Sequence, residues 1–431
     1  MISFRLPGDK SIAHRAVLFA PLAGSDSTVA NLPGGEDVRS SIRVMEGLGA
    51  KFSLDDGETG GTIRGGCRLR SPVGTLDCGN AGTTARLVSG ILTGLGLKAR
   101  LDGDASLRTR PMRRVFYPLQ AMGARLDLPG GAYTLPVQFR PRATGSLRTL
   151  VHRPRVASAQ VKSALLLAGL TGGIRVEVKE PALSRDHTER MLGAMGAPVD
   201  FDPDRRGEGR VILDPSGWDG ELAGFTLDIP GDPSSAAFLI VAGILARRSV
   251  HLADVSANPG RTAFLDLVEQ TGTTVEREVH PPRAGEPVQS WTVKPPDRVR
   301  PFSVGGADIP RLIDELPAAA VLAAVADGVS EIRDAAELRV KETDRIAAIA
   351  ANLEALGVEV DERVDGISVR GRAPGTPNRL AGAVRAFGDH RIAMAFGALG
   401  LVTGAGIEVD DPKVADISFP GYWKELKRFK G

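Results

Sequence analysis

Polar and basic residues recur along the sequence in six short clusters, each directly before or at the start of a stretch rich in Ala, Leu and Val. Ser and Asp at such positions are typical helix N-caps, and this interpretation fits Asp232, Ser234 and Ser235. It does not explain Lys and Arg, because a cation at a helix N-terminus opposes the helix dipole unless an anion is present. Helix N-termini bind phosphate and carboxylate through free backbone amides. We therefore expect anions beside the basic members, which are Lys10, Arg15, Arg86 and Arg391.

Further basic residues come from segments between these clusters. Arg110 lies in SLRTRPM, Arg185 in LSRDH, and Lys341 and Arg345 in the run RVKETDR. If RVKETDR formed an exposed helix, Lys341 and Arg345 would lie four residues apart among mixed-sign pairs and need no ligand. The sequence leaves both a solvated helix and an anion-binding segment open for this run.

Several catalytic and cofactor motifs are absent from the sequence. It contains no GxxxxGK[ST], no GxGxxG between strand and helix, no HExxH and no GxSxG. The two cysteines, Cys67 and Cys78, are too few for a disulfide framework and lack the spacing of metal ligands. We therefore expect no nucleotide cofactor and no protein-bound metal.

A repeat with a period of about 75 residues organises the chain. Its first marker is a glycine that ends an amphipathic stretch, as in MEGLGAKFSL, and it recurs at Gly49, Gly123, Gly196, Gly272 and Gly357. Such a glycine is typical of a helix C-cap. Its second marker is a short apolar strand near Val29, Leu101, Val176, Val250, Ile332 and Ile407. Six repeats of helix, strand, helix and one or two further strands therefore fill the chain.

The helix that opens each repeat is apolar on nearly every face, as in QVKSALLLAGL and SSAAFLIVAGIL. A helix of this kind must be buried on all sides. Amphipathic helices and strands then surround it. We expect an α/β fold of two similar domains with mixed sheets, each domain built from three repeats around buried helices.

Size and composition agree with a globular protein of two domains. The chain has 431 residues, of which 42% are hydrophobic and 25% charged, and its net charge is only +2. No global field exists to hold nucleic acid or an anionic membrane, so neither is an expected partner. The N-terminal MISFRLPGDK has no apolar core of signal-peptide length, and no apolar run reaches about 18 residues. We expect a cytoplasmic protein.

Nine segments resemble, in order, the signatures of the 5-enolpyruvylshikimate-3-phosphate synthase family. They are LPGDKSIAHRA, CGNAGTTAR, DASLRTRPM, ASAQVKSALLLA, SRDHTERM, PGDPSSAAF, LIDELPA, RVKETDRI and GDHRIAMA. The resemblance covers nearly the whole chain, from Pro7 to Ala395. It implies an inside-out α/β barrel in which βαβαββ-like repeats form two domains, residues 11–227 and residues 1–10 with 228–431, with the active site in the cleft between them.

The activity that the resemblance implies is transfer of the enolpyruvyl group of phosphoenolpyruvate to the 5-hydroxyl of shikimate 3-phosphate, with release of phosphate. This reaction belongs to the shikimate pathway of aromatic amino acid biosynthesis, by way of chorismate. The residues that match the family's shikimate 3-phosphate contacts are Lys10, Ser11, Arg15, Ser158, Ala159, Gln160, Ser184, Asp314 and Lys341. Those that match the phosphoenolpyruvate contacts are Lys10, Gly82, Arg110, Gln160, Arg345 and Arg391.

The resemblance also assigns catalytic roles. The attacking hydroxyl must lose a proton and C3 of the donor must gain one, which requires a base and an acid. Asp314 matches the base, and Glu342, assisted by Lys10, matches the group that delivers the proton. The family implies no metal and no cofactor. It further implies inhibition by glyphosate, and we expect a monomer.

The sequence departs from some branches of the family at three positions. Ile417 stands where those branches have a lysine that contacts phosphoenolpyruvate, Ala159 where they have serine, and Leu87 where they have proline. Lys413 is a candidate replacement for the missing lysine, although no spacing argument supports it. These changes put the donor pocket wall and the sensitivity to glyphosate in question.

Two other functions are weighed against this one. The related transferase that acts on UDP-N-acetylglucosamine usually carries a cysteine near DASLRTRPM, and this loop has none. A non-catalytic repeat protein that binds anions or RNA backbones would also suit basic clusters. It is disfavoured because aromatic residues make up only 5% and none lies in those clusters, so bases have no stacking platform.

Overall fold

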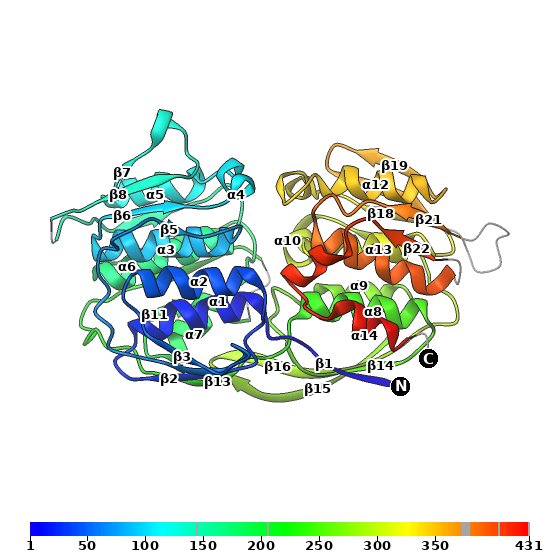
Figure 1. Cartoon of the computed structure of the whole chain (residues 1–431), viewed down its shortest axis with the longest axis horizontal. Helices are drawn as coiled ribbons and strands as arrows, with labels where there is room; N and C mark the ends of the chain where they lie inside the picture. Colours follow the sequence, from blue (N-terminus) through cyan, green and yellow to red (C-terminus); the bar gives the residue numbers. More distant parts are fainter. Residues whose placement is uncertain (144, 205–206, 372–379, 404–405, 430–431) are drawn as a thin grey trace. The chain divides into compact units, whose positions relative to one another are not determined.

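The computed structural model describes residues 1–143, 145–204, 207–371, 380–403 and 406–429. The chain forms two compact units (Figure 1). Unit 1 comprises Met1–Pro7, Pro230–Pro281 and Pro287–Gly431, and unit 2 comprises Gly8–Ile229 and Pro282–Glu286. These boundaries lie two or three residues from the sequence-based ones at 11 and 227, and they assign the short segment 282–286 to the other domain. Each unit has its own hydrophobic core.

Unit 2 contains three mixed sheets of four strands, ordered β13-β2-β4-β3, β5-β6-β8-β7 and β11-β12-β10-β9. The strands are β2 (Ser27–Ala30), β3 (Phe52–Leu54), β4 (Gly61–Ile63), β5 (Leu76–Asp77), β6 (Ala99–Asp102), β7 (Arg125–Asp127), β8 (Val137–Arg140), β9 (Leu150–His152), β10 (Val176–Glu180), β11 (Val199–Phe201), β12 (Gly209–Leu213) and β13 (Thr226–Asp228). The helices are α1 (Lys10–Phe19), α2 (Glu36–Gly47), α3 (Gly82–Leu95), α4 (Ala105–Thr109), α5 (Arg113–Met122), α6 (Ala159–Gly172) and α7 (His187–Ala194).

Unit 1 contains the sheets β1-β14-β16-β15 and β17-β18-β20-β19 and the pair β21-β22. The strands are β1 (Ile2–Arg5), β14 (Val250–Ser256), β15 (Thr274–Arg283), β16 (Glu286–Lys294), β17 (Ser303–Val304), β18 (Val329–Ile332), β19 (Glu359–Arg363), β20 (Gly366–Arg370), β21 (Gly382–Val384) and β22 (Ile407–Val409). The helices are α8 (Pro233–Leu245), α9 (Ala263–Gln270), α10 (Ile309–Leu312), α11 (Leu316–Ala323), α12 (Arg345–Ala355), α13 (His390–Thr403) and α14 (Tyr422–Lys427).

The sheets share one plan, and it confirms the predicted repeat. In each sheet an edge strand pairs parallel with the second strand, as Ile2 does with Val250 and Thr226 with Thr28. The remaining strands of the four-stranded sheets pair antiparallel. Every strand predicted from the second repeat marker is this second strand of its sheet, from β2 to β22. The predicted C-cap glycines all have positive φ, from 74° at Gly357 to 116° at Gly123.

The apolar helices predicted to be buried are α1, α3, α6, α8, α11 and α13, and nearly all of their described side chains are inside a core. Glycines let two of them pack closely. A Cβ on Gly90 of α3 would lie 2.1 Å from the carbonyl oxygen of Ala164 on α6, so only glycine fits there. Among the residues that the structure describes, no helix is long and apolar enough to cross a membrane.

Candidate functional site

The first turn of α1 carries Lys10, Ser11 and, one turn later, Arg15. Asp9 caps this helix and accepts hydrogen bonds from the backbone amides of Ser11 and Ile12 at 2.7 and 3.0 Å. Lys10 pairs with Asp37 of α2 at 2.8 Å, so this cation already has a carboxylate partner within unit 2. Lys10 thus has a counterion within unit 2, and its predicted contacts with both substrates stay predictions.

Arg15 is almost completely buried and joins α1 to its neighbours. Its Nε donates to Oγ1 of Thr188 at 2.7 Å, and its Nη2 donates to Oγ of Ser163 at 2.9 Å. Its Nη1 donates to the carbonyl oxygen of Ser11 at 2.9 Å. Burial lowers the pKa of Arg15 to about 10, although nearby carboxylates oppose the shift. Arg15 thus remains a cation at neutral pH, with its guanidinium held in place by hydroxyls.

Gln160 in the first turn of α6 is held at both ends of its amide. Its Oε1 accepts from Nη1 of Arg86 at 2.9 Å, and its Nε2 donates to Oγ1 of Thr83 at 2.9 Å. Arg86 and Thr83 both lie in the first turns of α3, so these bonds bring the N-termini of α3 and α6 together. Because the amide is held at both ends, the second hydrogen on Nε2 and the other lone pair of Oε1 point in fixed directions. Arg86 was expected to accompany an anion, and its partner here is this amide.

Gly82 begins α3 beside two guanidinium groups. A Cβ at Gly82 would lie 2.6 Å from Nη1 of Arg86 and 3.5 Å from Nη1 of Arg110. Arg110 follows α4, and its Nη2 donates to Oδ1 of Asn80 at 2.5 Å. The predicted donor contacts Gly82, Arg110 and Gln160 are therefore brought to one place in unit 2. Gly8, which lies two residues before Lys10, has a packing role instead. A Cβ added to Gly8 would lie 2.1 Å from the carbonyl oxygen of Asn31, so only glycine fits there.

The remaining predicted contacts of unit 2 lie near the same helix ends. Ser158 is the N-cap residue of α6 but makes no side-chain capping bond, and Ala159 begins the helix; both are partly exposed. Ser184 lies between β10 and α7, is buried, and donates its hydroxyl hydrogen to Oε1 of Glu180.

In unit 1 the predicted residues gather around Arg345, the first residue of α12. Its Nε donates to Oδ2 of Asp389 at 2.7 Å and its Nη2 to Oε2 of Glu342 at 2.7 Å, and its Nη1 lies 3.6 Å from Oδ1 of Asp314. Burial acts to lower the pKa of Arg345, but Asp389, Glu342 and Asp314 together raise it above its ordinary value. Arg345 is therefore a permanent buried cation that contacts both residues predicted to move protons.

Arg391 approaches Asp314 from α13. Its Nη1 donates to the Asp314 carbonyl oxygen at 3.0 Å, and its Nη2 lies 3.7 Å from Oδ2 of the Asp314 carboxylate. Asp314 itself follows α10 and is two residues ahead of α11. Each oxygen of the carboxylate thus has a guanidinium group within 4 Å. An anion was expected beside Arg391, and in this structure the Asp314 carboxylate lies there; the predicted contact with phosphoenolpyruvate stays a prediction.

The run RVKETDR does not form the exposed helix considered above. Arg339 lies in a 3₁₀ helix, Ala336–Val340, and pairs with Asp344 at 2.7 Å. Lys341 follows in an extended conformation and is partly exposed, and α12 begins only at Arg345. Lys341 and Arg345 are therefore not neighbours on one helical face, and the helical alternative for this run is wrong.

Sequence reasoning did not assign to the site the residues that hold the predicted ones in place, although the six polar clusters include several of them. These are Asp37, Asn80, Thr83, Lys162, Glu180 and Asp389. Most of them lie inside the nine segments that resemble the family signatures. The signal that could have identified them is a polar side chain at the start of an apolar helix. Ile417 lies at the end of a 3₁₀ helix, Pro412–Ile417, which also contains Lys413, and Leu87 is buried in α3.

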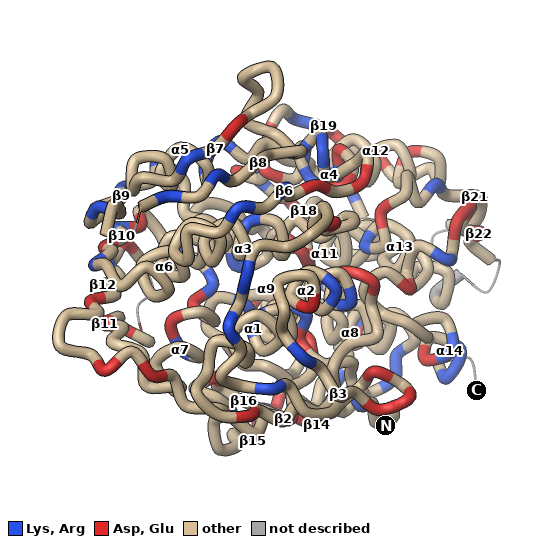
Figure 2. The backbone as a smooth tube through the Cα atoms, turned by 60° about the vertical axis from the view of Figure 1, so that its left-hand side comes forward, with Lys and Arg blue, Asp and Glu red and all other residues tan. Residues whose placement is uncertain are grey.

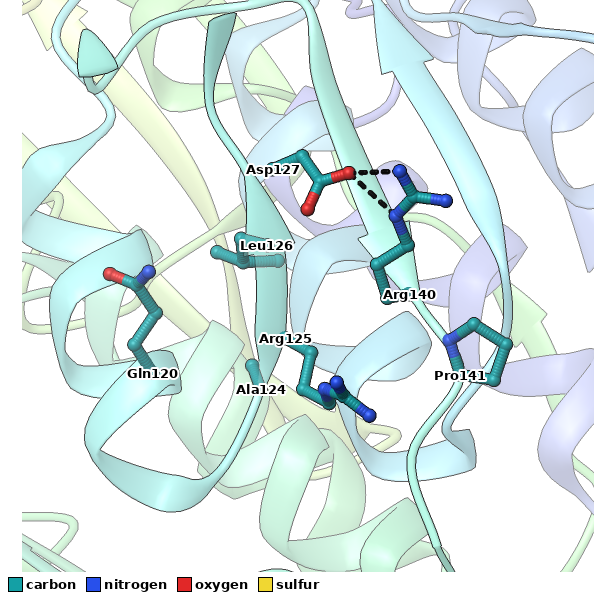
Figure 3. Close-up of a pocket in the computed structure, with 7 residues that line it drawn as sticks. All are labelled: Gln120, Ala124, Arg125, Leu126, Asp127, Arg140 and Pro141. Atoms are coloured by element: carbon teal, nitrogen blue, oxygen red, sulfur yellow. Dashed lines mark hydrogen bonds and ion pairs between the residues drawn. The ribbon is translucent and has the colours of Figure 1, made fainter.

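A separate cavity lies on the surface of unit 2 and holds none of the predicted residues. It has a volume of about 680 Å³ and is lined by residues of α5, β7 and β8 and their flanks, including Gln120, Arg125 and Arg140 (Figure 3). Arg140 donates to Asp127 at 2.5 Å, so that cation has an internal partner. In the described part of the chain, no three His, Cys, Asp or Glu side chains are grouped so that they could hold a metal ion.

Comparison with solved structures identifies the fold class of the protein. The structure aligns with the enolpyruvyl transferase NikO from Streptomyces tendae with a TM-score of 0.75, covering 100% of this chain and 95% of that one. At 18% sequence identity this likeness concerns the fold alone. The predicted class, an α/β protein with the enolpyruvyl transferase fold, is confirmed.

The family follows from closer relatives. A family model described as EPSP synthase (3-phosphoshikimate 1-carboxyvinyltransferase) matches residues 3–426. A 3-phosphoshikimate 1-carboxyvinyltransferase from Salinibacter ruber is 46% identical over 98% of this chain and 95% of its own, and one from Synechococcus is 43% identical over 99% and 96%. An EPSP synthase structure from Acinetobacter baumannii has a TM-score of 0.86 at 34% identity, covering 99% and 95%. The chain belongs to the EPSP synthase family.

Proposed function

We propose that this protein transfers the enolpyruvyl group of phosphoenolpyruvate to the 5-hydroxyl of shikimate 3-phosphate and releases phosphate. The observation that carries the proposal is the family match over residues 3–426, and the contacts of Asp314 and Glu342 with the same buried Arg345 support it. The UDP-N-acetylglucosamine transferase and the non-catalytic anion-binding protein have no comparable support. Basic and acidic residues are also interspersed along the described backbone (Figure 2), which does not favour a nucleic-acid surface.

The proposed chemistry has two steps. The Asp314 carboxylate accepts the proton of the 5-hydroxyl as its oxygen attacks C2 of phosphoenolpyruvate, and Glu342, assisted by Lys10, delivers a proton to C3. In the second step the Glu342 carboxylate takes back a proton from C3, the C–O bond to phosphate breaks, and the carbon–carbon double bond is restored. The proton held by Asp314 leaves with the phosphate. Arg110, Arg345, Arg391 and Lys10 stabilise the charge of the departing phosphate.

The predicted site residues are divided between the two units. The donor residues Gly82, Arg110 and Gln160 belong to unit 2, and Arg345 and Arg391 belong to unit 1. The base and the proton donor, Asp314 and Glu342, both contact Arg345. We therefore propose that the active site requires both units. The substrate contacts themselves remain predictions carried over from the family.

A direct assay tests the function. The protein is incubated with shikimate 3-phosphate and phosphoenolpyruvate without added metal, and phosphate and the enolpyruvyl product are measured; UDP-N-acetylglucosamine replaces the acceptor in a parallel reaction. We expect turnover when shikimate 3-phosphate is the acceptor and none when UDP-N-acetylglucosamine replaces it. Turnover only with the nucleotide sugar, or with neither acceptor, would contradict the proposal. Inhibition by glyphosate, a monomeric state and a cytoplasmic location are further parts of the proposal, open to titration, light scattering and fractionation.

A further inference from the structure

Lys162 is a buried cation on α6 that sequence reasoning did not place among the substrate contacts. Its Nζ lies 2.8 Å from Oε2 of Glu180 and 2.7 Å from Oε1 of Glu189, and all three side chains are at most 1% exposed. Glu180 is the last residue of β10, and Glu189 lies in the first turn of α7. One ammonium group therefore ties a helix, a strand and a second helix of unit 2 together.

One of the predicted acceptor contacts is attached to this cluster directly. Ser184 donates its hydroxyl hydrogen to Oε1 of Glu180, while the other oxygen of the same carboxylate faces Lys162. The Glu180 carboxylate therefore bridges the buried cation and the serine. Ser184 is thus hydrogen-bonded to a carboxylate that is itself ion-paired with Lys162.

A second acceptor contact is attached through sequence neighbours of the cluster. Arg15 donates hydrogen bonds to Thr188 and Ser163. Thr188 directly precedes Glu189 in the chain, and Ser163 directly follows Lys162. The hydroxyls of Ser163 and Thr188 are themselves 2.6 Å apart. Lys162 is thus linked to Ser184 through Glu180, and to Arg15 through its chain neighbour Ser163.

A buried ion cluster of this kind is weak evidence for a purely stabilising role. Desolvation of the charges offsets their attraction, and apolar side chains of similar volume often serve a core equally well. Burial raises the pKa of Glu189 above its ordinary value, whereas Lys162, despite its burial, has a raised pKa because Glu189 and Glu180 lie beside it. Removal of Lys162 alone would leave the buried Glu180 and Glu189 carboxylates without their shared cation, so the test changes Glu180 instead.

We propose that Lys162 and Glu180 are positioning residues of the acceptor half-site that act through Ser184. The inference rests on the proposed function. Glu180 fixes the Ser184 hydroxyl before the acceptor arrives, so that less conformational freedom is lost on binding. Lys162 neutralises Glu180, so that the phosphate of an anionic acceptor does not meet an uncompensated carboxylate behind Ser184.

The test begins with Glu180→Gln, which keeps the shape of the side chain and leaves Glu189 as the counterion of Lys162. We expect the KM for shikimate 3-phosphate to rise about tenfold, with kcat and the KM for phosphoenolpyruvate, measured at saturating acceptor, nearly unchanged. Glu177→Gln is the matched control, since Glu177 lies on the same strand but pairs with Arg175 and Lys179. It should keep the wild-type KM.

A double-mutant cycle separates positioning from a general structural role. If Glu180 acts through Ser184, then Glu180→Gln should add no further rise in KM to a Ser184→Ala variant. Glu180→Asp, which keeps the charge but withdraws the carboxylate by one methylene group, serves if Glu180→Gln does not fold, and it should also raise the KM. An unchanged KM in the folded Glu180 variant, or additive effects in the cycle, overturns the positioning role. A wild-type protein without turnover of shikimate 3-phosphate contradicts the proposed function instead.

Discussion

At the scale of single residues, the proposed chemistry depends most directly on Asp314. Its carboxylate oxygens lie 3.6 and 3.7 Å from the guanidinium groups of Arg345 and Arg391. Arg345 in turn bonds Glu342 and Asp389, so the proposed base and acid share one buried cation. A change to the charge of Asp314 should therefore affect catalysis more than folding.

We predict that Asp314→Asn folds normally and loses most of its turnover, on the order of a hundredfold or more, because an amide cannot accept the hydroxyl proton. The shape is kept, so binding of shikimate 3-phosphate should survive. Steady-state rates and calorimetric affinities of the variant and the wild type check both statements. Near-native turnover of Asp314→Asn would remove this residue from the role of base.

His14 provides a residue-scale prediction about stability. It is buried in α1, its Nδ1 lies 2.7 Å from Oγ of Ser41, and burial lowers its pKa to about 3. The folded protein therefore keeps His14 neutral, while the unfolded chain binds a proton below about pH 6.5. Because the unfolded state then holds more protons, stability must fall as the pH drops from about 6.5 toward 3.

We predict that this histidine costs the wild type about 2 kcal/mol of unfolding free energy between pH 7.5 and pH 5. His14→Gln removes the titrating group, so its stability should fall less over the same range, whatever its stability at pH 7.5. Urea denaturation of both proteins at the two pH values measures the difference. Equal losses in the two proteins would show that His14 is not held neutral by the fold.

At the scale of elements, the site depends on how closely the buried helices approach. The N-terminal turns of α1, α3 and α6 meet through the bonds of Arg15 and Gln160. Further along, α3 and α6 come into close contact at Gly90 and Gly94, where an added Cβ would lie 2.1 Å from the Ala164 carbonyl oxygen and 1.9 Å from Oγ1 of Thr171. The glycines of α3 thus fix the helix spacing that brings Gln160 to Arg86.

We predict that Gly90→Ala lowers the unfolding free energy by about 3 kcal/mol, because the added methyl group meets backbone that cannot move aside. Gly193→Ala is the matched control: Gly193 is also in a helix, α7, and a methyl group added there would have nothing within 4 Å. That substitution should stabilise the protein by about 0.5 to 1 kcal/mol. Denaturant titrations compare the two, and equal effects would contradict the packing argument.

At the scale of the whole molecule, the predicted donor contacts are divided between the two compact units. Gly82, Arg110 and Gln160 are in unit 2, while Arg345 and Arg391 are in unit 1. Arg110 and Gln160 have hydrogen-bond partners within unit 2, and Arg345 and Arg391 have partners within unit 1, so we expect each predicted half-site to be organised within its own unit. Full affinity for phosphoenolpyruvate should then require both half-sites at once, which links donor binding to the acceptor.

We predict that phosphoenolpyruvate binds well only when shikimate 3-phosphate is present, because the acceptor's phosphate draws the two basic half-sites together. A coupling of about 1 to 3 kcal/mol corresponds to a 5- to 150-fold gain in affinity. Calorimetric titration of phosphoenolpyruvate with and without the acceptor measures it. The reciprocal titration should show the same factor, and equal affinities in both conditions would contradict the coupling.

The sequence by itself determined the repeat, the buried helices and the fold class. These features depend on local signals: the glycines from Gly49 to Gly357 cap helices through their own backbone conformation, and an all-apolar helix such as α8 must be buried wherever it lies. The family and its signature residues were also readable, because the nine motifs are contiguous in the chain.

Only the tertiary structure decided which charges neutralise each other. Lys10 pairs with Asp37 and Arg15 bonds Thr188, partners 27 and 173 positions away, and RVKETDR breaks between a 3₁₀ helix and α12 although its charge spacing suits one helix. Such pairs form where packed helices and strands happen to meet, and residue spacing along the chain carries no information about that meeting. For this reason the basic residues and several of their partners, such as Asp314, Glu342 and Gln160, were identified from the sequence, while the pairings between them became visible only in the folded units.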